Sequence, residues 1–112
     1  MSLKERIFDA LVTLDLPLAY NDSDITKLPR LNYFLISNYP IRLSNTKHRN
    51  VTRYQVDLFS DIPRDVESDV LLVKIEESLL KSRLKCSNWF EVSRIDADEE
   101  LGIYHYYVEV WA

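Results

Sequence analysis

VTRYQVDLFS, residues 51–60, is the stretch on which the predicted fold depends. Apolar and polar side chains alternate along it, with Tyr54, Val56 and Leu58 set among Arg53, Gln55 and Asp57. Successive side chains of a β-strand point to opposite faces of the sheet. The segment therefore predicts a strand with one buried face and one polar face.

A further strand is predicted just before this one in the chain. LNYFLIS, at 31–37, is rich in aromatic and aliphatic residues and predicts a strand that Pro40 ends. The polar stretch 41–50 then forms the tip of a long hairpin. Upstream, residues 15–30 contain two prolines and a run of turn-forming residues, which predicts an irregular connector. Within it, residues 16–20 have the composition of a short extended piece.

Two helices are predicted, one before and one after this hairpin. Residues 3–14 carry apolar side chains at helical spacing, and Ser2 with Glu5 forms a capping box at the start. The second helix is expected over 63–85, with Pro63 in its first turn. Its apolar residues form two stripes, Val66, Val70, Val73 and Leu80 in one and Leu71, Ile75 and Leu79 in the other. This broad apolar surface is enough to cover a sheet and to touch a neighbour.

The last part of the chain predicts a second strand pair. Strands are expected at Trp89–Ile95 and Ile103–Trp111, joined by the acidic turn 96–100. The predicted order is therefore α-β-β-α-β-β in a single domain over 1–112. Hairpins joined by helices favour an α+β fold: an antiparallel, about four-stranded sheet with two helices packed on one face.

The sequence holds little material for catalysis or for cofactor binding. A single cysteine excludes an internal disulfide and a thiolate metal site, and a single glycine excludes phosphate-cradling loops. The two histidines, His48 and His105, are far apart and neither is close to a nucleophile with an orienting acid. Neighbouring strands could bring Cys86 to His105, although a lone cysteine is usually a small core residue. We predict no enzyme activity, no cofactor and no metal.

One stretch of the chain is basic, although the net charge is −4. No acidic residue occurs between Asp24 and Asp57, and the same region carries Arg42, Lys47, His48, Arg49 and Arg53. Two interpretations stay open. The stretch is either a solvated loop that discourages aggregation at sheet edges, or a contact loop for an acidic partner surface or for DNA in a channel.

Three large aromatic residues also suggest a contact surface. Trp89, Tyr107 and Trp111 have the alternation of a second sheet face. If the helices cover the opposite face, these side chains form either an interface or a patch covered by residues 15–30.

Residues 53–112 resemble the tail-terminator, or tail-completion, proteins of long-tailed bacteriophages. The resemblance rests on the strand YQVDLFS at 54–60, the helix motif IEESL at 75–79, an acidic turn, and the closing strand LGIYHY at 101–106. Upstream, LPLAY at 16–20 and LPRLNYF at 28–34 match the proline-led start of that family.

This resemblance implies an α+β structural protein of the virion, without catalytic residues. It implies a hexameric ring that caps the tail tube, ends its growth and joins the head. The implied partners are further copies of itself, the major tail tube protein and a head-completion or connector protein, with DNA only passing through the lumen and no membrane. It also implies that the loop 39–51 is mobile in the free subunit and orders in the ring.

Other functions stay open beside this one. The chain could be another head–tail connector or minor tail protein. From a different class, it could be a ferredoxin-like binding or regulatory module, including one that binds RNA, or a small enzyme. The charged start of the chain lacks the features of a signal peptide, so we expect a cytoplasmic protein. The family resemblance further implies assembly in the cytoplasm of a bacterial host and residence at the head-proximal end of the tail.

Overall fold

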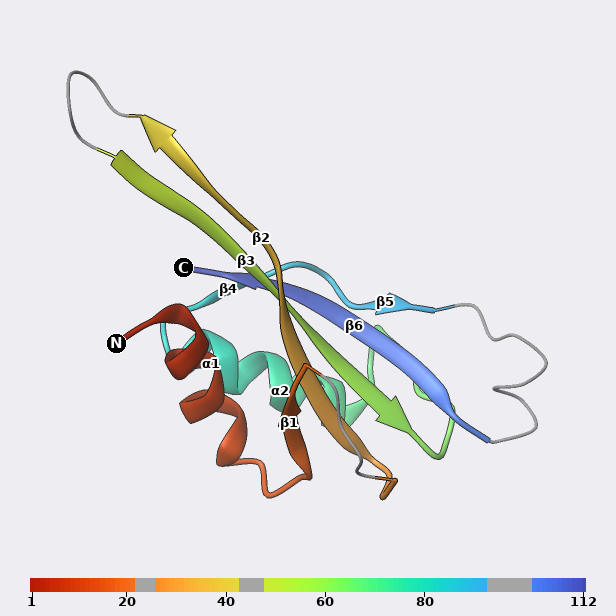
Figure 1. The fold of residues 1–112 in the computed structure, drawn as a ribbon. Helices are drawn as coiled ribbons and strands as arrows, with labels where there is room; N and C mark the ends of the chain where they lie inside the picture. Colours follow the sequence, from red (N-terminus) through yellow and green to blue (C-terminus); the bar gives the residue numbers. More distant parts are fainter. Residues whose placement is uncertain (22–25, 43–47, 93–101) are drawn as a thin grey trace.

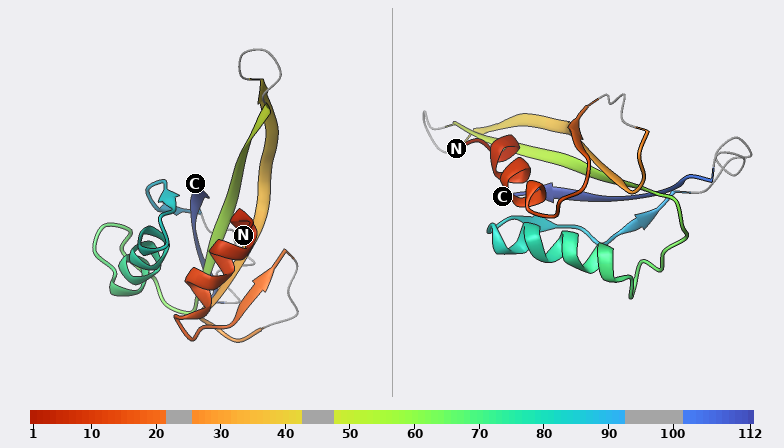
Figure 2. Two further views of the ribbon diagram at one scale, coloured as in Figure 1. Left: turned by 90° about the vertical axis from the view of Figure 1, so that its left-hand side faces the viewer. Right: turned by 90° about the horizontal axis from the view of Figure 1, so that it is seen from below.

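A computed structural model gives the structure of the protein, with residues 1–21, 26–42, 48–92 and 102–112 described and the backbone alone described at 40–42 and 48–50. The elements follow in the order α1 (Leu3–Val12), β1 (Leu18–Tyr20), β2 (Arg30–Arg42), β3 (His48–Ser60), α2 (Val70–Lys81), β4 (Lys85–Cys86), β5 (Phe90–Glu91) and β6 (Tyr104–Trp111). The α+β class is confirmed. Both helices lie on the same face of the sheet, as Figure 2 shows.

The sheet is mixed and six-stranded, so the predicted antiparallel sheet of about four strands is wrong in count and order. Its order is β1-β2-β3-β6-β4, with β5 also paired to β6. The extended piece expected within 16–20 is β1, which pairs in parallel with β2 through Leu31–Tyr33. All the other strand pairs are antiparallel.

Of the strand expected at Trp89–Ile95, the described residues show only β5 at Phe90–Glu91, and an unpredicted two-residue strand, β4, precedes it at Lys85–Cys86. β4 and β5 both pair with β6, and the chain leaves the sheet between them. Ser87 holds this detour in place, because its backbone N–H donates to the Glu109 carbonyl oxygen and its Oγ accepts from the Glu109 N–H, both at 2.9 Å. Residues 93–101, which include the rest of the expected strand and the acidic turn, lie outside the described residues.

The hairpin of β2 and β3 is longer than predicted. Each strand has 13 residues, and their far ends extend well beyond the other strands in Figure 1. Pro40 does not end β2. It pairs with Asn50, in a part of β2 that, among the described strands, is bordered by β3 alone, and an edge strand tolerates a residue that lacks an N–H. A one-residue bulge at Ile36 separates this outer part from the rest of β2.

Helix α2 begins at Val70, so the start predicted at Pro63 is wrong. Asp69 is the N-cap, and its carboxylate accepts from the N–H groups of Leu71 and Leu72 at 3.0 and 3.2 Å. Asp69 also pairs with Arg64 at 3.1 Å. This cap sets the start of the helix, and residues 63–69 form a turn-rich approach to it. The helix ends at Lys81 rather than at 85.

Helix α1 matches its prediction closely, ending at Val12 instead of Leu14. The Ser2–Glu5 capping box is present. The guanidinium of Arg6 donates to the carbonyl oxygens of Ser82 and Arg83, at 3.0 and 3.3 Å. These carbonyls follow the last turn of α2, where the helix dipole favours a positive charge. Arg6 therefore ties α1 to α2.

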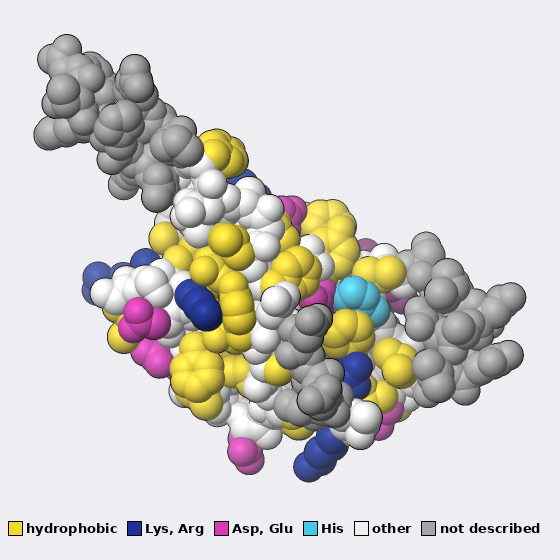
Figure 3. All heavy atoms as spheres, in the orientation of Figure 1, with side chains coloured by type: hydrophobic (Ala, Val, Ile, Leu, Met, Phe, Trp, Pro, Cys, Tyr) yellow, Lys and Arg dark blue, Asp and Glu magenta, His cyan; other side chains and the backbone are white. Residues whose placement is uncertain are grey.

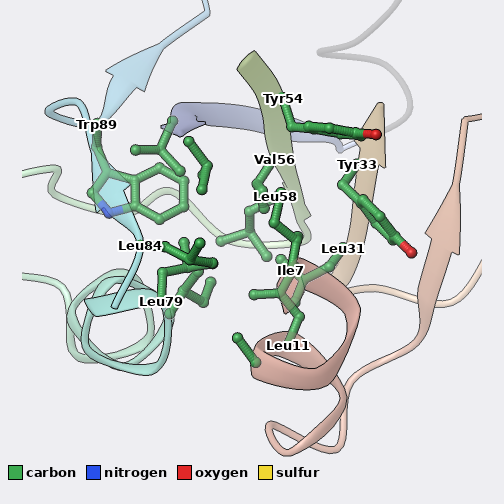
Figure 4. Close-up of a cluster of buried hydrophobic side chains, with 14 of the residues drawn as sticks. Ile7, Leu11, Leu31, Tyr33, Tyr54, Val56, Leu58, Leu79, Leu84 and Trp89 are labelled. Atoms are coloured by element: carbon green, nitrogen blue, oxygen red, sulfur yellow. The ribbon is translucent and has the colours of Figure 1, made fainter. Parts of the chain in front are cut away.

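The core lies between the sheet and the two helices. Figure 4 shows its side chains converging from both layers. Alternate positions of β3 and β6 point inward, as predicted, and the fully buried residues of these strands include Val56, Leu58, Tyr106, Val108 and Val110. The helices contribute Ile7, Leu11, Leu72, Ile75 and Leu79. Among the described residues, no helix has the length and apolar character needed to cross a membrane.

Candidate functional site

The face of the sheet opposite the helices is the first candidate surface. Figure 3 shows hydrophobic side chains and one histidine gathered over the strands on this side. Because β3 and β6 pair in register, the outward residues of the two strands form rows, with Phe59 beside His105 and Asp57 beside Tyr107. Phe90 of β5 extends the second of these rows. We call this surface the helix-free face.

A buried carboxylate lies at the centre of the helix-free face. Asp57 is only 3 % exposed, although no helix covers it. Its Oδ1 accepts from the Gln55 amide at 2.8 Å and lies 2.8 Å from Nε2 of His105. The amide oxygen of Asn32, the β2 residue opposite Asp57, is buried without a hydrogen-bond partner among the described residues. Asp57 Oδ1 is thus shared by two side-chain partners, of which His105 is the one that comes from another strand.

Stacked rings extend from this cluster in two directions. The Phe59 ring stacks on His105 at 4.4 Å between centroids, and the Arg30 guanidinium lies 4.8 Å from the Phe59 centroid on β3. In the neighbouring row Phe90 stacks on Tyr107 at 5.0 Å. These rings cover one another, so a partner of this face would meet pre-packed side chains rather than mobile ones.

Arg53 and Trp111 form the other end of the helix-free face. The Arg53 guanidinium lies 4.2 Å from the centroid of the Trp111 ring, and its Nη1 is 3.8 Å from a Glu109 carboxylate oxygen. Trp111 and Tyr107 therefore lie on this face, as predicted. Whether they contact a partner stays a prediction.

Trp89, the third predicted interface aromatic, is elsewhere. It is 8 % exposed and points into the core near Leu79 and Leu84, as Figure 4 shows. The alternation that placed it with Tyr107 assumed one continuous strand from Trp89. The detour at Ser87 changes that, because Trp89 precedes the short β5 and packs on the helix side. Within the segment 15–30, β1 lies beside β2 at the other edge of the sheet from β4, and residues 22–25 lie outside the described residues.

The β2–β3 hairpin is the second candidate surface. The segment between the two strands is shorter than the predicted contact loop, because β2 extends to Arg42 and β3 begins at His48. Arg42, His48 and Arg49 thus belong to strands, and Lys47 lies outside the described residues. Of the predicted basic residues only Arg53 has a described side chain, and it packs on the body of the domain.

Cys86 and His105 do not form a pair. Cys86 is opposite Val110 on β6 and faces the helices, whereas His105 lies near the other end of β6 on the helix-free face. Burial, with a smaller effect of the Glu76 carboxylate, raises the pKa of the Cys86 thiol to about 11. This is the opposite of an activated nucleophile.

We expect Cys86 to react slowly with thiol reagents in the folded protein. Relative to an ordinary value of 9.0, a pKa of about 11 lowers the thiolate fraction at pH 8 by about a hundredfold. The rate of modification by a chromogenic disulfide, followed by absorbance, should therefore be about a hundredfold or more below that of the protein in denaturant, and it should rise up to about pH 11. Equal rates in both states would contradict the raised pKa.

The same shift has a consequence for stability. As the pH rises, the thiol of the unfolded chain ionises before that of the folded protein. The contribution of the neutral Cys86 thiol to the free energy of unfolding is therefore fully present below about pH 9, and it is lost as the pH rises through 11.

The hollows at the surface are open and border no cluster of reactive groups. One, of about 530 Å³, lies between the start of α1 and Tyr33. A second, of about 460 Å³, is lined by Val66, Glu67, Glu76, Asn88 and Trp89. Within the part of the chain that the structure describes, no three His, Cys, Asp or Glu side chains lie close enough to hold a metal ion.

Sequence reasoning missed the Asp57–His105 cluster. Asp57 lies on the predicted polar face of its strand and His105 alternates with Tyr107 and Trp111 along the last strand, but their contact depends on the pairing of β3 with β6, which strand patterns alone do not determine. The one available signal was an acid and a histidine at outward positions of two adjacent strands.

No protein-family model matches the chain, and none of the curated proteins compared with it matches either.

Proposed function

We propose that the protein is a structural assembly subunit of the tail-terminator type, which forms a ring on a tail tube and ends its growth. The observation that carries this proposal is the projecting hairpin of β2 and β3. A hairpin that extends beyond the domain without covering any of its core is suited to contact another subunit.

The hairpin offers unpaired sheet edges on both sides. β1 borders β2 only through Leu31–Tyr33, and β6 borders β3 only from Tyr54 to Ser60. Among the described residues, no strand borders 34–42 on one side or 48–53 on the other. Unpaired N–H and C=O groups on a strand edge are a template for pairing with another chain.

A ring needs a contact between two different patches, repeated around an axis until it closes. The hairpin supplies one patch that stands away from the body. The helix-free face, with its pre-packed aromatic and charged side chains, supplies a different patch for the neighbouring subunit. The proposal therefore uses both candidate surfaces, and it needs no catalytic group.

The experiment that tests this proposal is electron microscopy of purified tail tubes mixed with the recombinant protein. Tubes of the phage or prophage that encodes the chain are required. We expect rings at one end of each tube and an end to further growth when tube protein is added. Tubes that keep growing, with no density at their ends, would contradict the proposal.

We expect that reversing charge at the hairpin tip abolishes capping without unfolding the protein. The variant is Lys47→Glu with Arg49→Glu. Arg53 is left unchanged because it packs on Trp111 and pairs with Glu109. The measurements are the fraction of capped tubes and the thermal unfolding midpoint, with Lys27→Glu, at an exposed site outside the hairpin, as the matched control. If the double variant caps tubes normally, the hairpin tip has no role in capping and is only solvated surface.

A binding module is the second candidate, and the helix-free face favours it. Aromatic rings with arginines on a sheet surface are a common platform for single-stranded nucleic acid. The ferredoxin-like order expected for such a module is not present, because α1 precedes every strand and no helix joins β1 to β2 in the described residues. A salt-sensitive shift of a short RNA at micromolar protein would support this function over the first.

A further inference from the structure

The outer side of α2, with the approach to it, carries an apolar stripe that no other described element covers. Its members are Val66, Val70, Val73 and Leu80, which are 36, 68, 41 and 51 % exposed. The opposite side of the same helix is buried through Leu72, Ile75 and Leu79. We call the first set the α2 stripe. Helix α2 is thus apolar on both sides, and only one of them serves the core of this domain.

Charged residues sit within and beside the stripe in a definite order. Glu77 lies between Val73 and Leu80 on the same side of the helix, and Lys74 and Lys81 flank it. All three side chains are exposed. In the described part of the chain none of them forms an ion pair. The stripe therefore presents two apolar ends, with Glu77 and Lys74 near its middle and Lys81 beside its last member, Leu80.

We propose that two copies of this chain pair through their α2 stripes, antiparallel and related by a twofold axis. Such a pairing sets the first half of one helix against the second half of the other. With the axis at the level of Ile75, Val70 lies against Leu80 and Val73 against Glu77 of the second copy. Glu77 is then one residue from the second copy's Lys74 along the helix, within reach of its ammonium group, and the same contact occurs twice.

The charge order favours this arrangement over the parallel one. A parallel pair would set Lys74 against Lys74 and Glu77 against Glu77, which is repulsive. A purely apolar partner helix would bury Glu77 without offering it a cation, leaving only Lys74 and Lys81 of its own helix nearby. A second, antiparallel copy is the occupant that covers the valines and also gives each Glu77 a lysine.

The pairing is expected to be weak. Helix α2 has 12 residues and is about 18 Å long, so the contact is well below the roughly 1,200 Å² of total area that stable complexes bury. We expect dissociation constants of about 10–100 μM, in the range of transient contacts. This inference does not rest on the proposed function, since it concerns the free protein and a surface outside the hairpin and the helix-free face.

The experiment is a charge exchange followed by sedimentation velocity. Lys74→Glu puts acids at both 74 and 77, and Glu77→Lys puts lysines at both. Each variant alone should repel itself and associate about tenfold or more weakly than the parent protein. An equimolar mixture of the two should pair again, because the doubly acidic stripe of the first variant then meets the doubly basic stripe of the second. Lys27→Glu is the matched control and should associate like the parent.

Three results would overturn the inference. The parent protein could sediment as a monomer up to several hundred micromolar. Either single variant could associate as strongly as the parent, which would place any self-association elsewhere, such as at the hairpin. The mixture could stay monomeric while both variants keep the parent's circular dichroism spectrum, which would exclude antiparallel α2 pairing. Capping of tail tubes is measured in a separate experiment. A failure of α2 pairing can therefore be told apart from a failure of the proposed capping function.

Discussion

Replacing Trp89 with alanine is expected to lower the free energy of unfolding by about 3–5 kcal/mol. The indole is only 8 % exposed and fills the core between α2 and the strands, next to Leu79 and Leu84. Removing it leaves a large cavity, because the surrounding backbone cannot fully collapse around the missing ring. Chemical denaturation followed by circular dichroism measures the change. Domains of this size are stable by only about 5–15 kcal/mol, so the variant should be close to unfolding at 37 °C.

Trp111→Ala is the matched control for this change. Its indole lies on the helix-free face under Arg53, so truncation removes a cation–π contact worth about 0.5–1 kcal/mol and some half-buried area. We therefore expect a much smaller loss than for Trp89. Equal losses for the two tryptophans would contradict the placement of Trp89 in the core and of Trp111 outside it.

Replacing His105 with alanine is expected to lower the free energy of unfolding by about 2 kcal/mol. Among the described residues two side chains donate to the Asp57 carboxylate, and the substitution removes one of them, so that Gln55 is the described donor that is left to a nearly buried carboxylate. A buried group that loses its partner costs about 1–3 kcal/mol, and a charged group costs more. Loss of the stacking between His105 and Phe59 adds a smaller amount.

A double-mutant cycle separates the contact between His105 and Asp57 from the loss of each side chain. Asp57→Ala should also destabilise the protein, and the double variant should cost less than the sum of the two singles by about 1–2 kcal/mol. The unfolding free energies of all four proteins, measured at one pH and salt concentration, give the coupling. Additive effects would show that the 2.8 Å contact contributes nothing of its own.

The parts of the fold that follow from local alternation were predictable. Tyr54, Val56 and Leu58 point inward because the strand has a period of two and one face must be covered. The capping box at Ser2 was also evident from residue types alone. These features depend on neighbours within a few positions, which a sequence displays directly.

Features set by tertiary pairing were not predictable. Pro40 continues a strand because only one side of β2 is paired there, and the sequence does not show which side that is. Helix α2 begins after Asp69 rather than at Pro63 because the carboxylate that caps it also pairs with Arg64. Trp89 turns inward because Ser87 bonds to Glu109 on a distant strand. For the same reason the Asp57–His105 cluster was not anticipated.

The position of β6 has a consequence for how the chain folds. It is the last strand in sequence, yet it sits between β3 on one side and β4 and β5 on the other. Until it inserts, the edge of β3 has unpaired N–H and C=O groups, and the two short strands have nothing to pair with. The whole stretch of chain from the end of β3 to the start of β6 must therefore be brought back to one place before the sheet can close. Such non-local closure is slow, on the order of milliseconds to seconds, and during that interval the open edge of β3 is the site most exposed to aggregation.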